Sequence, residues 1–230
     1  MLIGGLQKTS LIDYPDKVSC IVFTVGCNLR CPFCQNADLV IDTKETPIIA
    51  EKYFFNFLKS RKGLLDAVVI TGGEPLLQKD IEGFIKKIRS MGFLVKLDTN
   101  GCFPVRLKKL IDDKLLDYIA MDIKSSPSRY EKACGVKVDI KKIRESVRII
   151  MNSGVSYEFR TTAVPRLQKP RDFIKIGKWL EGARKYVIQK FSNEHTLDKK
   201  FGKESPYTQK EMEDIRKGLS KFFDKCEVRG

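Results

Sequence analysis

Hydrophobic residues along the chain follow two alternating patterns. Short runs rich in β-branched and aromatic residues predict buried strands, and these runs are Val18–Val25, Ala67–Thr71, Leu94–Leu97, Tyr118–Ile123, Tyr157–Thr162 and Lys185–Phe191. Between them, apolar residues recur three or four positions apart, which predicts amphipathic helices. The helical segments are Ile48–Arg61, Asp80–Met91, Pro104–Asp112, Lys141–Ser153 and Phe173–Leu180.

Boundary residues support this division. Pro104 and Pro170 stand where helices are expected to begin, and Gly92 and Gly154 follow two helix ends, where a left-handed cap is common. The segment Thr208–Asp224 predicts a last amphipathic helix. The polar stretch 193–206 before it is either an active-site loop or a connector.

Alternating strands and helices with nearly continuous apolar strands predict an α/β fold with a parallel sheet. Six strand–helix units are too few for a complete eight-unit barrel, so a partial barrel and a doubly wound sheet both remain open. In either case, the chemistry is expected at the C-terminal ends of the strands. The 230 residues suit one domain over 1–230, with a core at about 16–192 and a C-terminal loop and helix at 193–230.

Composition narrows the class of protein further. The hydrophobic share of 42% excludes a disordered or collagen-like chain. Lys and Arg number 43 against 29 Asp and Glu, which gives a net charge of +14. The basic residues are scattered as short pairs, so a solvated surface is favoured over a nucleic-acid interface, with an acidic partner as the alternative. We find neither a membrane-spanning segment nor a secretory signal, and therefore expect a cytoplasmic protein.

The seven cysteines include one clear cluster. Cys27, Cys31 and Cys34 have C-x3-C-x2-C spacing directly after the first predicted strand, so their thiols can converge around one metal centre. Structural zinc takes four ligands, whereas a 4Fe–4S cluster held by three thiolates leaves one iron open for chemistry. The alternative is a site with four protein ligands, which would recruit another cysteine: Cys102, Cys134 or Cys226.

Polar motifs end the next three strands. They are TGGEP at Thr71–Pro75, DTNG at Asp98–Gly101 and MDIKS at Met121–Ser125. Each also has a structural explanation, respectively a capped turn, an Asn-Gly turn and a local ion pair. The later strands end in polar groups for which ligand contact and ordinary strand-end polarity are equally open, namely Arg160–Thr162, Gln189 and Asn193. His195, the only histidine, is interpreted as a loop residue.

The cysteine motif, with Phe33 as the aromatic residue before the third cysteine, resembles that of the radical S-adenosylmethionine superfamily. The longer stretch Ser10–Asn36 is similar to the activating enzymes of glycyl-radical enzymes, especially those of anaerobic ribonucleoside-triphosphate reductase. Because the other motifs follow in family order, the resemblance covers the whole chain. It implies a partial (β/α)6 TIM-like barrel of parallel strands.

The resemblance also implies the ligands of the cofactors. Cys27, Cys31 and Cys34 would hold a 4Fe–4S cluster whose open iron binds S-adenosylmethionine. The remaining implied cofactor-binding residues are Phe33, Gly72, Gly73, Glu74, Asp98, Asp122 and Lys124. Of these, the GGE element would bind the amino group, the two aspartates would hold a monovalent cation, and the lysine would contact the carboxylate. No residue is assigned to the catalytic step itself.

The implied activity is reductive cleavage of S-adenosylmethionine to a 5′-deoxyadenosyl radical, which abstracts hydrogen from a glycine of a partner enzyme. Flavodoxin or ferredoxin would supply the electron. One departure is Gln35, where many relatives carry His. The alternatives are a radical enzyme acting on a small molecule or RNA, such as a deazapurine synthase or a tRNA modifier, and a non-catalytic metal-binding module.

Overall fold

The computed structural model describes residues 1–41 and 45–230. The chain forms two compact units. Unit 1 comprises residues 1–28, 38–99 and 105–119, and unit 2 comprises residues 29–37, 100–104 and 120–230. Whether the whole chain is one domain, as the sequence predicts, stays a prediction.

Unit 1 is built around four strands that lie in chain order. They are β1 (Ile3–Ser10), β2 (Ser19–Thr24), β3 (Ala67–Gly72) and β4 (Leu94–Thr99). β1 is antiparallel to β2, whereas β2, β3 and β4 are parallel, with Val68 paired to Cys20 on one side and Val95 on the other. Because the chain returns through a helix after each parallel strand, the C-terminal ends of these three strands meet at one edge.

Helices of unit 1 pack beside this part of the sheet, as the contacts of α3 with β4 show. The helical elements are α1 (Ala37–Val40, whose first residue belongs to unit 2), α2 (Glu51–Ser60), the 3-10 helix η1 (Pro75–Leu77), α3 (Ile81–Ser90) and α4 (Pro104–Asp112, which also begins in unit 2). Phe54 of α2 stacks on Phe84 of α3 at 5.2 Å between ring centroids. A second apolar cluster brings together Tyr14, Ile21, Ala67, Val69 and Tyr118. Burial of these residues supplies the main stabilisation of the unit.

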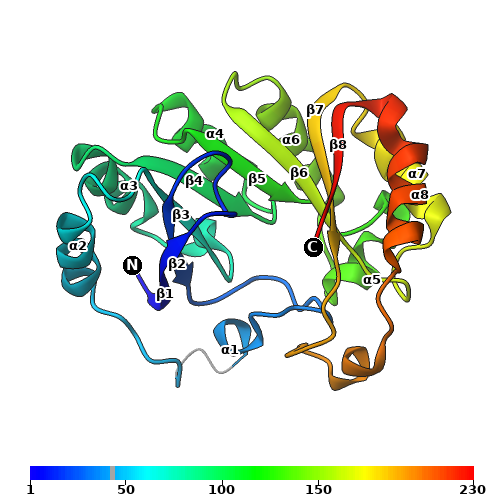
Figure 1. The fold of residues 1–230 in the computed structure, drawn as a ribbon, viewed down its shortest axis with the longest axis horizontal. Coiled ribbons are helices and arrows are strands. Elements are labelled where there is room, and N and C mark those ends of the chain that lie inside the picture. Colours follow the sequence, from blue (N-terminus) through cyan, green and yellow to red (C-terminus); the bar gives the residue numbers. More distant parts are fainter. Residues whose placement is uncertain (42–44) are drawn as a thin grey trace. The chain divides into compact units, whose positions relative to one another are not determined.

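In unit 2, the strands also follow chain order. They are β5 (Tyr118–Asp122, which begins in unit 1), β6 (Ser156–Ala163), β7 (Ala183–Lys190) and β8 (Phe223–Arg229), and β6, β7 and β8 are parallel. The helices are α5 (Tyr130–Cys134), α6 (Ile140–Met151), α7 (Pro170–Trp179) and α8 (Gln209–Leu219), with 3-10 turns η2 (Pro127–Arg129), η3 (Lys199–Lys203) and η4 (Ser220–Phe222). Figure 1 shows α8 beside α7, followed in the chain by β8.

Most predicted elements are confirmed, with boundaries shifted by a few residues. α4 and α7 begin at Pro104 and Pro170, and Gly92 and Gly154 have φ values of 92° and 72°. The prediction of a helix over Thr208–Asp224 is wrong at its C-terminal end, because α8 stops at Leu219 and the chain enters β8. β1 was not predicted. In the described part of the chain, no helix has the length and apolar content needed to cross a membrane.

Candidate functional site

Two backbone segments meet closely where β2 and β3 end in unit 1. Gly73 N donates to Thr24 O at 2.8 Å, and Glu74 N donates to Gly26 O at 2.8 Å. A Cβ atom on Gly73 would lie only 1.9 Å from Gly26 O, and Gly72 has φ 109° with Thr24 N 2.3 Å from its ideal Cβ position. The GGE element therefore needs both glycines, because backbone takes the space that side chains would fill.

Glu74 is fully buried beside the same turn. Its Oε1 accepts from Leu76 N at 3.0 Å, which caps η1, and from Thr99 Oγ1 at 2.8 Å. The turn cap expected from the sequence is thus present, and it links the end of β3 to the end of β4. Binding of a cofactor amino group by this element stays a prediction.

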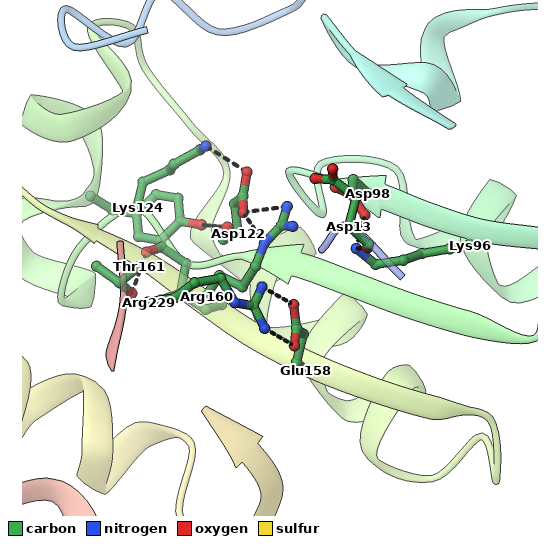
Figure 2. A network of polar contacts seen from close by, with 11 residues as sticks. Asp13, Lys96, Asp98, Asp122, Lys124, Glu158, Arg160, Thr161 and Arg229 are labelled. Atoms are coloured by element: carbon green, nitrogen blue, oxygen red, sulfur yellow. Dashed lines mark hydrogen bonds and ion pairs between the residues drawn. The ribbon is translucent and has the colours of Figure 1, made fainter. Parts of the chain in front are cut away.

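The aspartate that ends β4 has a lysine as neighbour. Asp98 Oδ1 lies 3.1 Å from Lys96 Nζ, whose side chain is 1% exposed. The same ammonium group donates to Asp13 O at 2.5 Å and lies 5.8 Å from the centre of the Tyr118 ring. Figure 2 shows Lys96 beside Asp13 and Asp98. A buried ammonium group is costly unless it is paired, so this contact is an integral part of unit 1.

The cysteine motif passes from one unit to the other. Cys27 lies at the end of a unit 1 segment, and Cys31 and Cys34 lie in unit 2. Within unit 2, Cys34 N donates to Cys31 O at 3.0 Å, and Phe33 between them is buried. A hydrogen bond from the Cys134 thiol lowers the pKa of Cys31 to about 7. Burial instead raises the pKa of Cys34.

Two other parts of unit 2 hold the cysteine loop. At the end of α5, Arg30 N donates to Cys134 O at 2.9 Å, and Gly135 leaves room for Arg30 O, which would lie 2.1 Å from a Cβ atom. From the segment after β7, Leu197 N donates to Cys34 O at 3.1 Å. The stretch 193–206 therefore contacts the cysteine motif and is more than a connector.

Asp122, at the end of β5, is paired with two cationic side chains in unit 2 (Figure 2). Its Oδ1 accepts from Arg160 Nε at 3.0 Å and lies 2.9 Å from Arg160 Nη2, and its Oδ2 accepts from Lys124 Nζ at 3.0 Å. Burial by itself would raise the pKa of Asp122, but the two positive charges outweigh it and lower the pKa to about 2. Asp122 is therefore a carboxylate at neutral pH.

The remaining candidate residues differ in their surroundings. Arg160 is hydrogen-bonded to Asp122, whereas His195 and Asn193 are exposed. Cys102 N donates to Asn100 Oδ1 at 3.0 Å in the turn that follows the DTNG motif. Sequence reasoning did not single out Lys96. Its position in the sequence could have indicated this contact. Lys96 lies within the apolar run Leu94–Leu97, and it stands two positions before Asp98, so both side chains are on the same face of the strand.

The donor atoms of the cysteine motif suit an iron–sulfur cluster. Thiolates are soft ligands that favour iron–sulfur clusters and zinc, and the lowered pKa of Cys31 favours its thiolate form. Over residues 1–41 and 45–230, no group of three or more His, Cys, Asp and Glu side chains is arranged to hold a metal ion. The assignment of Cys27, Cys31 and Cys34 as ligands therefore rests on residue type and spacing.

Comparison with known families identifies the chain. Residues 21–180 match the family described as the Radical SAM superfamily. The chain belongs to this superfamily. As a member, it is an enzyme that uses a 4Fe–4S cluster and S-adenosylmethionine, so these two predicted cofactors are confirmed at the level of the family, and the monovalent cation stays a prediction.

Curated relatives place the chain among the activating enzymes of this superfamily. A Methanocaldococcus jannaschii protein named as a glycyl-radical enzyme activating enzyme is 33% identical, over 99% of this chain and 95% of its own length. The pyruvate formate-lyase-activating enzyme of Clostridium pasteurianum is 25% identical, over 85% of this chain and 82% of its own. The 7-carboxy-7-deazaguanine synthase of Thermoplasma acidophilum is 28% identical, over 69% and 72% respectively.

A solved structure confirms the fold class. The structure of Streptococcus suis SuiB bound to the precursor peptide SuiA matches with a TM-score of 0.70 over 91% of this chain. The chain spans 48% of the length of SuiB. At 14% sequence identity this likeness concerns the fold alone, and it agrees with the predicted α/β fold of the radical S-adenosylmethionine type.

Proposed function

We propose that this protein activates a glycyl-radical enzyme, and that its partner is anaerobic ribonucleoside-triphosphate reductase. The observation that carries the proposal is the 33% identity with an activating enzyme over nearly the full length of both chains. The stretch Ser10–Asn36 supports this choice of partner, and a formate-lyase-like enzyme is the second choice.

In this proposal, Cys27, Cys31 and Cys34 bind the 4Fe–4S cluster. Once reduced by an external donor, a bound cluster would supply the electron that cleaves S-adenosylmethionine to methionine and the radical that takes hydrogen from the partner's glycine. The protein contributes by orienting the cofactor and excluding water. Lys124 can contribute directly, because an ammonium group has three donors and Asp122 occupies only one of them.

The glycine turn at the end of β3 would bind a different group of the same cofactor. Its backbone is held by the 2.8 Å hydrogen bonds of Gly73 and Glu74. A preformed backbone loses little conformational entropy on binding a ligand. We therefore assign the amino group of S-adenosylmethionine to Gly72, Gly73 and Glu74, as the family resemblance implies.

We also propose flavodoxin or ferredoxin as the electron donor, as the family resemblance implies, and the net charge is compatible with it. A net charge of +14 attracts an acidic redox protein, which suits flavodoxin or ferredoxin. Such attraction accelerates association at low ionic strength more than it strengthens the final complex.

The first test is anaerobic reconstitution with iron and sulfide, followed by incubation with dithionite, S-adenosylmethionine and the purified reductase. Electron paramagnetic resonance should show a reduced cluster that changes when S-adenosylmethionine is added, and then a glycyl radical on the reductase. 5′-Deoxyadenosine should form in step with the glycyl radical. A reduced cluster whose spectrum does not change when S-adenosylmethionine is added would refute the proposal.

Three single substitutions separate an open iron from a site with four protein ligands. Cys31→Ser should lower bound iron severely, because it removes one of three thiolates. Cys134→Ser should keep the cluster and its response to S-adenosylmethionine, although Cys134 contacts Cys31. Cys226→Ser, in β8, tests a second candidate for the fourth ligand and should also keep the cluster. Loss of the cluster in Cys134→Ser would instead identify a fourth protein ligand and favour the metal-binding module.

The second candidate function is synthesis of a deazapurine. The 28% identity with a 7-carboxy-7-deazaguanine synthase over 69% of this chain favours it. The two functions give different products, since one leaves a radical on a polypeptide and the other releases 7-carboxy-7-deazaguanine. Mass spectrometry of small-molecule products, run beside the glycyl-radical assay, decides between them.

A further inference from the structure

The segment that runs from α5 into α6, within unit 2, carries basic side chains without acidic partners. Residues 131–148 include six basic and three acidic side chains. The six basic residues are all exposed and are called the basic surface below: Lys132, Lys137, Lys141, Lys142, Arg144 and Arg148. Within the described ranges 1–41 and 45–230, no acidic side chain forms an ion pair with any of them. By contrast, Lys108 and Lys109 of α4 pair with Asp112 and Glu82.

The acidic residues of the segment neutralise its charge only in part. Asp139 Oδ1 accepts from Lys141 N at 3.0 Å and so caps α6. Glu131 Oε1 accepts from Val138 N at 3.3 Å. These two carboxylates are therefore engaged with the backbone of the turn, and Glu145 is the one acidic residue within α6.

Helical spacing places half of the basic surface on one stripe. Lys141, Arg144 and Arg148 stand at positions i, i+3 and i+7 of α6, so their side chains lie on the same face of the helix. Ile143 and Val147 are buried on the opposite face. Because α6 is anchored by its apolar face, the three charges of the stripe are presented by a packed helix.

The basic surface adjoins the cysteine loop of the same unit. It begins two residues before Cys134, whose carbonyl oxygen accepts from Arg30 N at 2.9 Å. Gly135 then leaves room for Arg30 O, which would lie 2.1 Å from a Cβ atom. Arg30 directly precedes Cys31. A protein bound on the basic surface would therefore lie next to the loop that carries Cys31 and Cys34.

We propose that the basic surface is the docking site of an acidic one-electron carrier protein of the flavodoxin kind. The inference rests on the proposed function, because it assumes a cluster that receives its electron from outside. Opposite charges accelerate the encounter of two proteins, and electron transfer is faster over a shorter distance. RNA is the other polyanion to consider, but residues 131–148 contain no aromatic side chain on which a base could stack.

The test follows association of purified, oxidised flavodoxin with the reconstituted protein, by anaerobic stopped-flow measurement of flavin fluorescence. The double substitution Lys141→Glu and Arg144→Glu reverses two charges of the stripe. We expect it to slow association about tenfold at low ionic strength. The difference should shrink below about twofold near 1 M salt, where the screening length is only about 3 Å. An unchanged association rate at low ionic strength would overturn the inference.

A substitution of opposite sign and a matched control complete this measurement. Glu145→Lys adds a positive charge to α6 and should accelerate association about threefold. Arg171→Glu with Lys175→Glu makes the same change of net charge at exposed positions of α7, another helix of unit 2. This control should stay within about twofold of the unsubstituted protein. Equal slowing in the control would show that only net charge matters, and would overturn the inference.

Dithionite separates this inference from the proposed function, because it supplies electrons without a docking protein. With dithionite, the Lys141→Glu, Arg144→Glu variant should form 5′-deoxyadenosine at the unsubstituted rate. With subsaturating reduced flavodoxin, it should be about tenfold slower. Equal rates with flavodoxin would overturn the inference. If the unsubstituted protein forms no 5′-deoxyadenosine even with dithionite, the proposed function fails, and the association rates still test the basic surface.

Binding of tRNA is the remaining measurement on the same variants. Weak binding that disappears by roughly 200 mM salt is expected of any exposed basic surface and agrees with the inference. A tRNA complex that persists at this salt in the unsubstituted protein and is lost on substitution of Lys141 and Arg144, but not of Arg171 and Lys175, would assign the basic surface to RNA. That outcome would overturn the inference.

Discussion

At the scale of single residues, Gly73 has no room for even one methyl group. Its Cβ would lie 1.9 Å from Gly26 O and 2.6 Å from Gly26 C. We expect Gly73→Ala to push the two segments apart, break the hydrogen bond from Glu74 N to Gly26 O and lower the free energy of unfolding by about 1–3 kcal/mol. Urea denaturation measures this loss, and binding of S-adenosylmethionine should weaken in parallel.

Gly83 provides the matched control for this substitution. It lies within α3, and a Cβ atom there would meet nothing within 4 Å. Because alanine favours a helix over glycine, Gly83→Ala should raise the free energy of unfolding by up to about 1 kcal/mol. If both variants lost stability equally, steric contact with Gly26 would not be the cause.

At the scale of elements, β8 is attached to β7 by charges as well as by backbone pairing. Glu227 Oε2 lies 3.2 Å from Lys185 Nζ of β7, and Glu227 Oε1 lies 2.5 Å from Lys225 Nζ of β8 itself. Burial would raise the pKa of Glu227, but the two lysines outweigh it and bring the pKa below 4.5. A carboxylate with a lowered pKa stabilises the folded state above its unfolded pKa and loses that effect as the pH falls.

The substitution Glu227→Gln tests this attachment. Near neutral pH it should lower the free energy of unfolding by up to about 1 kcal/mol, the range of partly exposed ion pairs. The difference from the natural protein should shrink as the pH falls through about 4.5 and lower, because Glu227 is then protonated in both states. Urea denaturation at several pH values measures this difference in the free energy of unfolding. Asp224→Asn, on the same strand, is the control. A difference independent of pH would contradict the argument.

The ends of the sheet are where sequence patterns predicted least. Phe222 and Phe223 continue the helical spacing of α8, yet Phe223 belongs to β8 and stacks on Tyr186 of β7 with ring centroids 4.7 Å apart. β1 contains Gly4, which is unusual in a strand. A Cβ atom on Gly4 would lie 2.5 Å from the Leu39 side chain. In both cases, contacts distant in sequence override the local pattern.

At the scale of the whole molecule, the order of elements and the location of the polar motifs could be predicted, because each depends on local periodicity. The partners of the charged groups could not. Asp122 and Arg160 are 38 residues apart, and the contact of Cys134 with Cys31 spans a longer separation still. Local rules predict which residues reach the end of a strand, whereas their charge balance depends on which other elements are packed there.

The net charge of +14 leads to a last prediction, which concerns RNA. If the basic residues form only a solvated surface, duplex DNA and tRNA should bind with similar, weak affinity. Binding should then fall steeply between roughly 50 and 200 mM salt, as counterion release requires. Fluorescence anisotropy over a salt series measures how steeply the affinity for DNA and the affinity for tRNA each fall with salt. A tRNA complex that persists at the higher salt and excludes DNA would instead indicate contacts to RNA itself, and would favour an RNA substrate over a glycyl-radical partner.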